Sequence, residues 1–192
     1  MDDLFDLPLL TGLCSVADFV EADEERGLIE RIDSLALAPF RFQGWLGKRL
    51  THSFGIHYDF DRAALARTDP PPPWLATVRD RAETALGLAA GTLEQALLIR
   101  YDPGAGIGWH RDRPHFDHVV GVSLGAPAAM RFRRRRGERF ERRTAPLPPR
   151  GLYHLNGEAR YDWEHSIAAM AATRWSITLR SLSERGRAAV GD

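Results

Sequence analysis

Cysteine, lysine and long apolar runs are scarce in this sequence. Cys14 is the only cysteine among 192 residues and Lys48 is the only lysine, so arginine supplies nearly all of the 26 basic residues. A lone cysteine cannot form a disulfide within the chain, which excludes a disulfide scaffold and favours a reducing compartment. The longest run without a charged residue or histidine, Val119–Met130, is shorter than the about 20 apolar residues of a membrane-spanning helix. We therefore expect a cytoplasmic monomer with no membrane partner.

The charged residues are unevenly distributed although the net charge is zero. Residues 1–33 hold ten acidic residues and two arginines, whereas residues 131–143 hold eight arginines and two glutamates. Guanidinium groups make bidentate contacts with carboxylates and phosphates. The arginine-rich segment is therefore either a phosphate-binding surface or an ordinary solvated face. The composition as a whole, 44% hydrophobic and 27% charged, is typical of a soluble globular domain.

Two helices and a series of strands are predicted by the apolar spacing. Apolar residues recur at helical spacing from about Ala22 to Ser34, and again from the end of Pro70–Pro73 to Leu86, where Gly87 ends the helix. Short β-forming runs follow at Gln95–Tyr101, Val119–Leu124, Met130–Arg135, Leu152–Asn156 and Trp175–Leu182. This order predicts an α+β domain whose sheets form a sandwich or jelly roll.

Three His-x-Asp pairs occur in the chain: His57-Asp59, His110-Asp112 and His115-Asp117. On a strand, such a pair points both side chains to one face, and a second histidine completes the two-histidine, one-carboxylate site of non-haem iron enzymes. His110-Asp112 is favoured because a glycine-rich stretch, Pro103–Gly108, precedes it and allows a close backbone approach. The other two pairs lie in a strand-like stretch and a loop, where surface or turn roles are expected.

The third ligand must come from elsewhere in the sequence. His165 is the candidate, and His154 is the competitor, although its apolar neighbours favour a core or cross-strand histidine. Downstream, Arg174, Ser176, Thr178 and Arg180 occupy alternate positions and share one face of a strand. Two arginines on a buried face need anions, so they either bind a small dicarboxylate or pair with acids of the protein.

Several of these stretches together resemble the AlkB family of iron(II)- and 2-oxoglutarate-dependent dioxygenases. The resemblance rests on Arg100–Gly104, His110–Asp112, Val122–Gly125, Ala159–Ile167 and Arg174–Arg180, with weaker matches at Phe42–Gly44 and Ser53–Gly55. It implies a double-stranded β-helix, or jelly-roll, core over about residues 95–182. N-terminal helices and a substrate lid would occupy about 1–94, and 183–192 would form a short tail, all within a single domain of residues 1–192.

The resemblance also assigns roles around the metal. His110, Asp112 and His165 would bind Fe(II) as the catalytic centre, with O2 and 2-oxoglutarate as cosubstrates. Arg174 and Tyr101 would hold the distal carboxylate of oxoglutarate, and Arg180 would lie near its metal-binding end. Ile99 and Ser176 stand where well-known members have asparagines. Ser176 can still donate a hydrogen bond, and Ile99 cannot, so fewer polar contacts to oxoglutarate are expected.

Nucleic acid is the substrate that the resemblance implies, through oxidative dealkylation of a base flipped out of its stack. Candidate substrate-binding residues are Trp45, Arg49, Phe54 and Tyr58 in the lid region, and Arg111 and Arg113 beside the metal ligands. The alternative to substrate binding for the three aromatic residues is packing in the hydrophobic core. Pro114 replaces an acidic base-reading residue, so the preferred base stays open.

Two other functions remain open at this stage. The same chemistry can act on a transfer RNA wobble modification or on a protein side chain. A jelly-roll binding module without catalysis is the third alternative.

Overall fold

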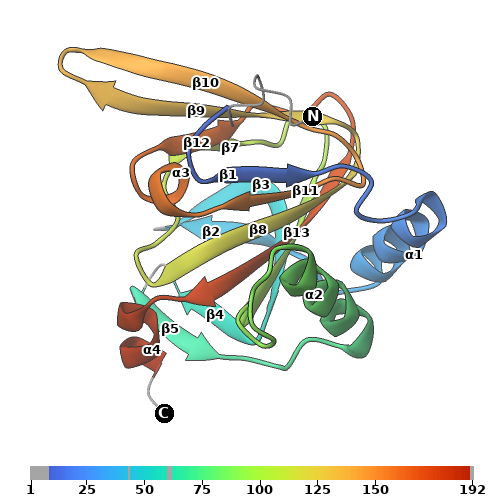
Figure 1. The fold of residues 1–192 in the computed structure, drawn as a ribbon. Helices are drawn as coiled ribbons and strands as arrows, with labels where there is room; N and C mark the ends of the chain where they lie inside the picture. Colours follow the sequence, from blue (N-terminus) through green and yellow to red (C-terminus); the bar gives the residue numbers. More distant parts are fainter. Residues whose placement is uncertain (1–8, 43, 60–61, 191–192) are drawn as a thin grey trace, which may run out of the picture.

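Two antiparallel sheets face each other in the computed structural model, which describes residues 9–42, 44–59 and 62–190 (Figure 1). The strands are β1 (Leu13–Val16), β2 (Ala38–Phe42), β3 (Trp45–Phe54), β4 (Ile56–Asp59), β5 (Ala64–Arg67), β6 (Gln95–Tyr101), β7 (Ile107–His110), β8 (Phe116–Gly125), β9 (Ala128–Arg136), β10 (Arg139–Leu147), β11 (Leu152–Leu155), β12 (Glu164–Ile167) and β13 (Arg174–Leu182). The helices are α1 (Ala22–Asp33), α2 (Pro73–Ala85), α3 (Gly157–Tyr161) and α4 (Glu184–Val190).

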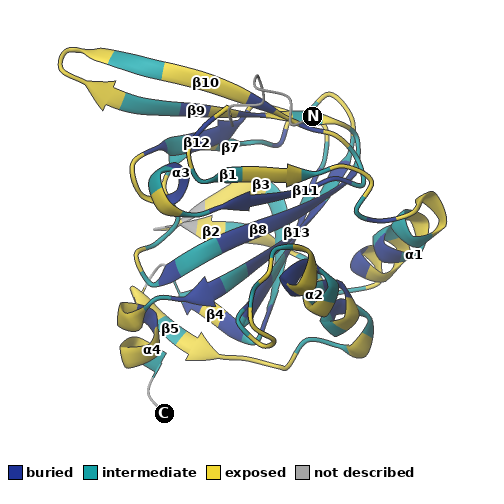
Figure 2. Ribbon diagram, in the orientation of Figure 1, coloured by how far each residue is buried: buried dark blue, intermediate teal, exposed yellow. Residues whose placement is uncertain are grey.

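The larger sheet has the strand order β1-β11-β8-β13-β6-β3-β2, and the smaller sheet has the order β10-β9-β12-β7. Strands β4 and β5 form a separate hairpin. Figure 2 shows the buried residues concentrated along the central strands β8 and β13, whereas most of the β9–β10 hairpin is exposed. The predicted α+β jelly roll is confirmed.

Helices α1 and α2 cover the outer face of the larger sheet. Their apolar stripes, represented by Ile32 and Leu75, pack against strand residues such as Leu98, Val122 and Ile177. Helix α2 begins at Pro73, where a missing backbone N–H costs nothing, and the left-handed backbone of Gly87 (φ +65°) follows its end. Both helices occur where the apolar spacing predicts them.

The second core fills the space between the sheets. It joins Tyr153 and Leu155 of the larger sheet to Met130, Phe132 and Ile167 of the smaller one. On β13 the alternation therefore sends odd-numbered residues to the helices and even-numbered residues inward, which confirms the predicted shared face. No helix in the described part of the chain is long and apolar enough to cross a membrane.

The predicted strands between Gln95 and Leu182 are all present, although several are longer than their apolar runs. The N-terminal strands are the main addition. Strands β2 and β3 extend one side of the larger sheet, and β1 pairs with β11 at the other side. The sheet that carries the inward-facing arginines is therefore built from both ends of the chain.

Candidate metal centre

Three side chains converge at one end of the smaller sheet. His110 on β7 lies directly opposite His165 on β12, with their ring centroids 4.3 Å apart. Asp112 follows β7, and its Oδ2 is 3.5 Å from Nε2 of His165. One ligand atom from each residue lies within 4.8 Å of the others, and no other such group occurs in the described ranges. The three predicted metal ligands are thus brought together.

The glycine-rich approach to His110 serves the packing of two strands. A β-carbon on Gly106 would lie 2.8 Å from the carbonyl oxygen of Ile167 and 2.9 Å from that of Ala168. Because Gly106 has no side chain, β7 can lie close enough to the end of β12 to align the two histidines. The predicted close approach is therefore real, but its partner is the backbone after His165.

The histidines favour the neutral form that binds metals. Nδ1 of His110 is 2.9 Å from the carbonyl oxygen of Gly108, which accepts its proton and leaves Nε2 as the free ring nitrogen. Burial, and next the neighbouring His110, lower the pKa of His165 from 6.5 to about 3. Burial is also the main cause of the lowered pKa of His110. Both imidazoles are therefore neutral at physiological pH.

Asp112 is held as a carboxylate by a neighbouring arginine. Arg180 donates from Nε to Oδ1 of Asp112 at 2.8 Å, and its Nη1 donates to Oε1 of Gln95 at 2.9 Å. The Asp112 side chain is 5% exposed. Burial alone would raise its pKa, but the charge of Arg180 holds the pKa below its ordinary value. Arg180 thus orients a candidate ligand, and Gln95 positions Arg180.

Arg174 is a buried cation without an anion. Its exposure is 0%, and its Nε donates to Oγ of Ser123 at 3.1 Å. Nη1 and Nη2 are buried and have no hydrogen-bond partner among the described residues. The guanidinium carbon lies 5.3 Å from the ring centroid of Tyr101, opposite Arg174 in the β-ladder. A buried guanidinium with two unused donors fits a carboxylate ligand.

Ser176 and Thr178 line the same inward face between the two arginines. Both are buried, and their hydroxyl oxygens are 3.5 Å apart. Ile99 lies opposite Ser176 on β6 and is also buried. The face between the arginines is thus less polar than a pair of asparagines would make it.

Arg49 also points to this inward face. The residues of β3 that pair with Ile99 and Leu97 share its side of the sheet, and the charges of Arg180 and Asp112 act on its guanidinium. The guanidinium carbon lies 3.8 Å from the ring centroid of Phe40, and its buried Nε has no hydrogen-bond partner in the described structure. Burial lowers its pKa from the ordinary value.

Phe54 does not lie in the lid, which corrects one prediction. It pairs with Ala96, and both belong to the core under the helices. Strand alternation places it on the face opposite Arg49, because the two residues are five positions apart on the strand. Trp45 begins β3, but its side chain lies outside the described part of the structure.

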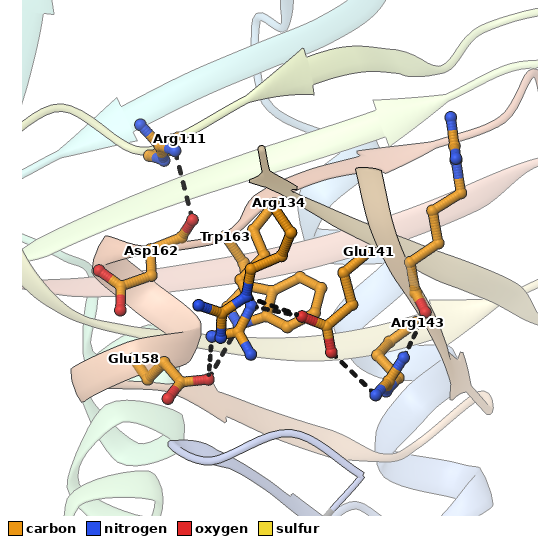
Figure 3. Close-up of polar contacts among 9 residues, drawn as sticks. Arg111, Arg134, Glu141, Arg143, Glu158, Asp162 and Trp163 are labelled. Carbon is orange, nitrogen blue, oxygen red and sulfur yellow. Dashed lines mark hydrogen bonds and ion pairs between the residues drawn. The ribbon is translucent and has the colours of Figure 1, made fainter. Parts of the chain in front are cut away.

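Tyr58 and Arg113 pack against each other, and Arg113 directly follows Asp112 in the sequence. Tyr58 is buried on β4, the guanidinium carbon of Arg113 lies 5.1 Å from its ring centroid, and His115 packs 5.5 Å away. Arg111 is exposed and donates to the carbonyl oxygen of Asp162 at 3.2 Å (Figure 3). Arg111 and Arg113 flank Asp112 in sequence and lie closer to the surface than its carboxylate.

The remaining histidines have other roles. His154 is buried on β11, and its Nε2 is 2.9 Å from Nδ1 of His118. This confirms the cross-strand interpretation of His154. Asp117 accepts a hydrogen bond from the Tyr161 hydroxyl at 2.6 Å, and His57 is exposed on β4. Neither of the other two His-x-Asp pairs belongs to a ligand cluster in the ranges that the structure describes.

Two functional positions could not be assigned from the sequence. Gln95 and Ser123 hold the two arginines, the first at Arg180 and the second at Arg174. Ser123 lies within a recognised motif, and its small hydroxyl gave no further signal. Gln95 begins a predicted strand, and only the register between β6 and β13 shows that it lies opposite Arg180.

The chain belongs to the 2OG-Fe(II) oxygenase superfamily, whose family model matches residues 21–187. The cofactors that this family implies are Fe(II), 2-oxoglutarate and O2, as predicted, and the residues fit them. Two neutral histidines and a carboxylate form the donor set of non-haem iron sites, and Arg174 offers unused donors for a carboxylate.

Within this superfamily the chain is similar to AlkB proteins. It is 31% identical over 161 residues to the tRNA (carboxymethyluridine(34)-5-O)-methyltransferase alkbh8 of Xenopus tropicalis, covering 81% of this chain and 25% of that protein. It is 31% identical over 138 residues to the alpha-ketoglutarate-dependent dioxygenase AlkB of Salmonella typhimurium, covering 62% of this chain and 61% of that one. The chain thus spans about a quarter of the length of the first relative.

A solved structure of OsALKBH1 shares the fold. The TM-score is 0.70 at 15% sequence identity, and the match covers 88% of this chain and 96% of the other. This likeness shows the fold of the chain and agrees with the match to the superfamily model.

Proposed function

We propose that this chain is an Fe(II)/2-oxoglutarate-dependent dioxygenase that removes alkyl groups from bases of DNA or RNA. One observation carries the proposal: the cluster of His110, Asp112 and His165 lies in the same jelly roll as the buried, anion-free guanidinium of Arg174. An iron site alone occurs in enzymes that catalyse many different reactions, and a buried arginine alone does not indicate a function. Together they fit a metal that needs a dicarboxylate cosubstrate.

Different residues would have different roles in such a reaction. His110, Asp112 and His165 would hold Fe(II), while Arg180 keeps the carboxylate of Asp112 ionised and oriented. Arg174 would bind the distal carboxylate of oxoglutarate beside the ring of Tyr101. Iron with oxoglutarate and O2 supplies the oxidation that turns a C–H bond into C–OH. A methyl group on nitrogen hydroxylated in this way is lost as formaldehyde, which restores the base.

Nucleic acid is supported as the substrate by the relatives and by the rim of the site. One relative is the alpha-ketoglutarate-dependent dioxygenase AlkB, and an Arabidopsis thaliana protein, 26% identical over 184 residues, is named an alkylated DNA repair protein. Arg111 and Arg113 would contact phosphates, and Tyr58 would contribute to the pocket for the base.

Oxidation of a modified uridine in transfer RNA is a second candidate. The Xenopus tropicalis relative is named for carboxymethyluridine, a base with an anionic group at physiological pH. Arg49 favours this candidate, because its buried guanidinium on the metal side of the sheet has an Nε without a partner. An anionic base substituent would fit that donor, whereas a methyl group would not use it.

The test is product analysis with iron(II), oxoglutarate and a panel of alkylated DNA and RNA oligonucleotides and modified transfer RNA. Release of formaldehyde with matching succinate from the alkylated strands is the expected result. His110→Ala should abolish turnover, whereas the matched control His57→Ala removes the histidine of a His-x-Asp pair outside the cluster and should keep it. A panel without any product, while oxoglutarate is still converted to succinate, would refute nucleic-acid dealkylation. Product only from modified transfer RNA would establish the second candidate.

A further inference from the structure

The β9–β10 hairpin, which projects from the body of the molecule (Figure 1), has two chemically different faces. Phe132 lies beside the metal-ligand face, because it pairs with His165. Alternation therefore places Arg134 on that inner face and Arg131 and Arg133 on the outer one. The ladder to β10 adds Phe140 and Arg142 to the outer face, opposite residues 135 and 133.

The arginines on the inner face of the hairpin are partly neutralised by acids. Arg134 lies between two carboxylates, with its Nε 2.7 Å from Glu141 and its Nη1 2.7 Å from Glu158 of α3 (Figure 3). Its guanidinium carbon is 4.4 Å from the ring centroid of Trp163. Arg143 also pairs with Glu141, at 2.9 Å. These contacts fasten the hairpin to α3. Glu141 also pairs with Arg136 at 3.4 Å, so three of the four inner-face arginines have an acidic partner among the described residues.

The outer face holds its arginines on aromatic rings. Trp109 of β7 has the guanidinium carbons of Arg131 and Arg133 at 5.3 and 4.5 Å from its ring. Phe140 has those of Arg133, Arg135 and Arg142 at 4.8, 6.0 and 5.6 Å. Such stacking fixes a guanidinium group while leaving N–H donors directed to solvent. We call this surface the arginine platform: Trp109, Arg131, Arg133, Arg135, Phe140 and Arg142.

Positive charge on the platform is largely uncompensated. Glu164 is the one acidic residue on this face of the four described strands, and it pairs with Arg133 at 2.6 Å. Arg131 donates to Oγ of Ser166 at 3.1 Å, and Arg135 donates to the carbonyl oxygen of Gly137 at 3.1 Å. Arg142 likewise reaches only a carbonyl oxygen. Three guanidinium groups thus lack an anionic partner among the described residues.

We propose that the arginine platform binds the phosphate backbone of single-stranded nucleic acid on the outer face of the sheet that carries the metal ligands. Clustered guanidinium groups match a row of phosphates, and the exposed arginines together with the half-buried rings of Trp109 and Phe140 offer stacking surfaces to unpaired bases. The platform reaches the edge strand β7 that carries His110, because Trp109 directly precedes His110 there and points to the opposite face of the strand. The choice of nucleic acid over other polyanions rests on the proposed function.

Two triple variants with the same loss of charge test the platform. Arg131→Ala/Arg135→Ala/Arg142→Ala removes its unpaired arginines. Arg136→Ala/Arg139→Ala/Arg143→Ala removes three arginines at inner-face positions of the same hairpin. Binding of an unmodified oligodeoxythymidylate and of its ribonucleotide counterpart is measured by fluorescence anisotropy over a range of salt concentrations. Circular dichroism and the unfolding midpoint check that each variant is folded.

The expected result is a weaker salt dependence of oligonucleotide binding in Arg131→Ala/Arg135→Ala/Arg142→Ala only. Three lost phosphate contacts at about 0.7 each lower the slope of log affinity against log salt by about 2. An effect confined to the DNA or to the RNA strand assigns the platform to that polymer. Equal losses in both variants, or no loss in either, would overturn the proposal. Because unmodified strands are bound and not turned over, a failure of dealkylation leaves this readout unaffected.

Discussion

Replacing Arg174 by methionine tests whether its guanidinium binds the distal carboxylate of oxoglutarate. Methionine has a similar length and no charge, so Arg174→Met removes two buried donors that have no partner and one donor bonded to Ser123. Each unsatisfied buried donor costs about 1–3 kcal/mol, and the lost hydrogen bond to Ser123 contributes about 1 kcal/mol. Without oxoglutarate, the variant should therefore be more stable than the wild type by about 1–5 kcal/mol.

Oxoglutarate should reverse this order. Two charge-assisted hydrogen bonds to its distal carboxylate contribute about 3–6 kcal/mol, so the variant should bind oxoglutarate about 10²–10⁴ times more weakly. The assay is thermal unfolding with Fe²⁺ in the absence of O2, with and without oxoglutarate, so that no turnover occurs. At about 2–4 °C per kcal/mol for a chain of this size, both effects are measurable.

Arg160→Met is the matched control for this experiment. Arg160 is also buried, but its Nη2 donates to the carbonyl oxygens of Arg113 and Phe116 at 2.7 and 2.6 Å. Its loss should lower the unfolding temperature and keep the rise that oxoglutarate induces. If Arg174→Met instead destabilises the protein and still responds to oxoglutarate like the wild type, Arg174 is a structural residue and the cosubstrate assignment is wrong.

Two further perturbations address the scaffold. Burial, and next the neighbouring His118, lower the pKa of His154 from 6.5 to about 4, so the unfolded state binds more protons between these values and stability falls as the pH falls through this range. The loss is at most about 3 kcal/mol at about 1.4 kcal/mol per pH unit, and urea titrations of His154→Gln at several pH values should show a shallower dependence than the wild type; an equal dependence contradicts the assignment. In Gly121→Ala the new β-carbon would overlap the buried ring of Tyr153, and the free energy of unfolding should fall by about 1–3 kcal/mol. Gly27→Ala, in α1 with open space around it, should instead raise stability by about 0.5–1 kcal/mol, and equal effects of the two substitutions would show that the Tyr153 overlap is relieved at no cost.

Local patterns in the sequence predict the parts of the site that lie on single strands. The alternation of Arg174 and Arg180 on β13 needs only the two-residue period of a strand, and His110-Asp112 needs little more. The period does not say which face turns inward. The family resemblance puts Phe54 in the lid region with the core as the alternative, and only the pairing of β3 with β6 shows that Phe54 faces the helices.

Contacts between distant segments explain the other differences. The polar sequence of β3 around Lys48–Ser53 has no alternating apolar pattern, and it forms a strand because β6 offers an open edge for hydrogen bonds. The arginines between residues 131 and 143 likewise lie on two different faces of the hairpin, which the sequence alone does not show. Its partners Glu141, Glu158 and Glu164 become visible only when the hairpin and its neighbours are folded.

The separation of acidic and basic residues along the chain also has a consequence at long range. Helix α1, with Asp23, Glu24 and Glu25 in its first turn, lies at one side of the molecule, and the β9–β10 hairpin extends from the other (Figure 1). A neutral molecule with this arrangement is an electric dipole. In the field of a polyanion, such a dipole experiences a torque that turns the hairpin toward the polyanion and α1 away from it. Encounters would therefore begin in one preferred orientation, and added salt would randomise them before it altered any contact in the metal centre.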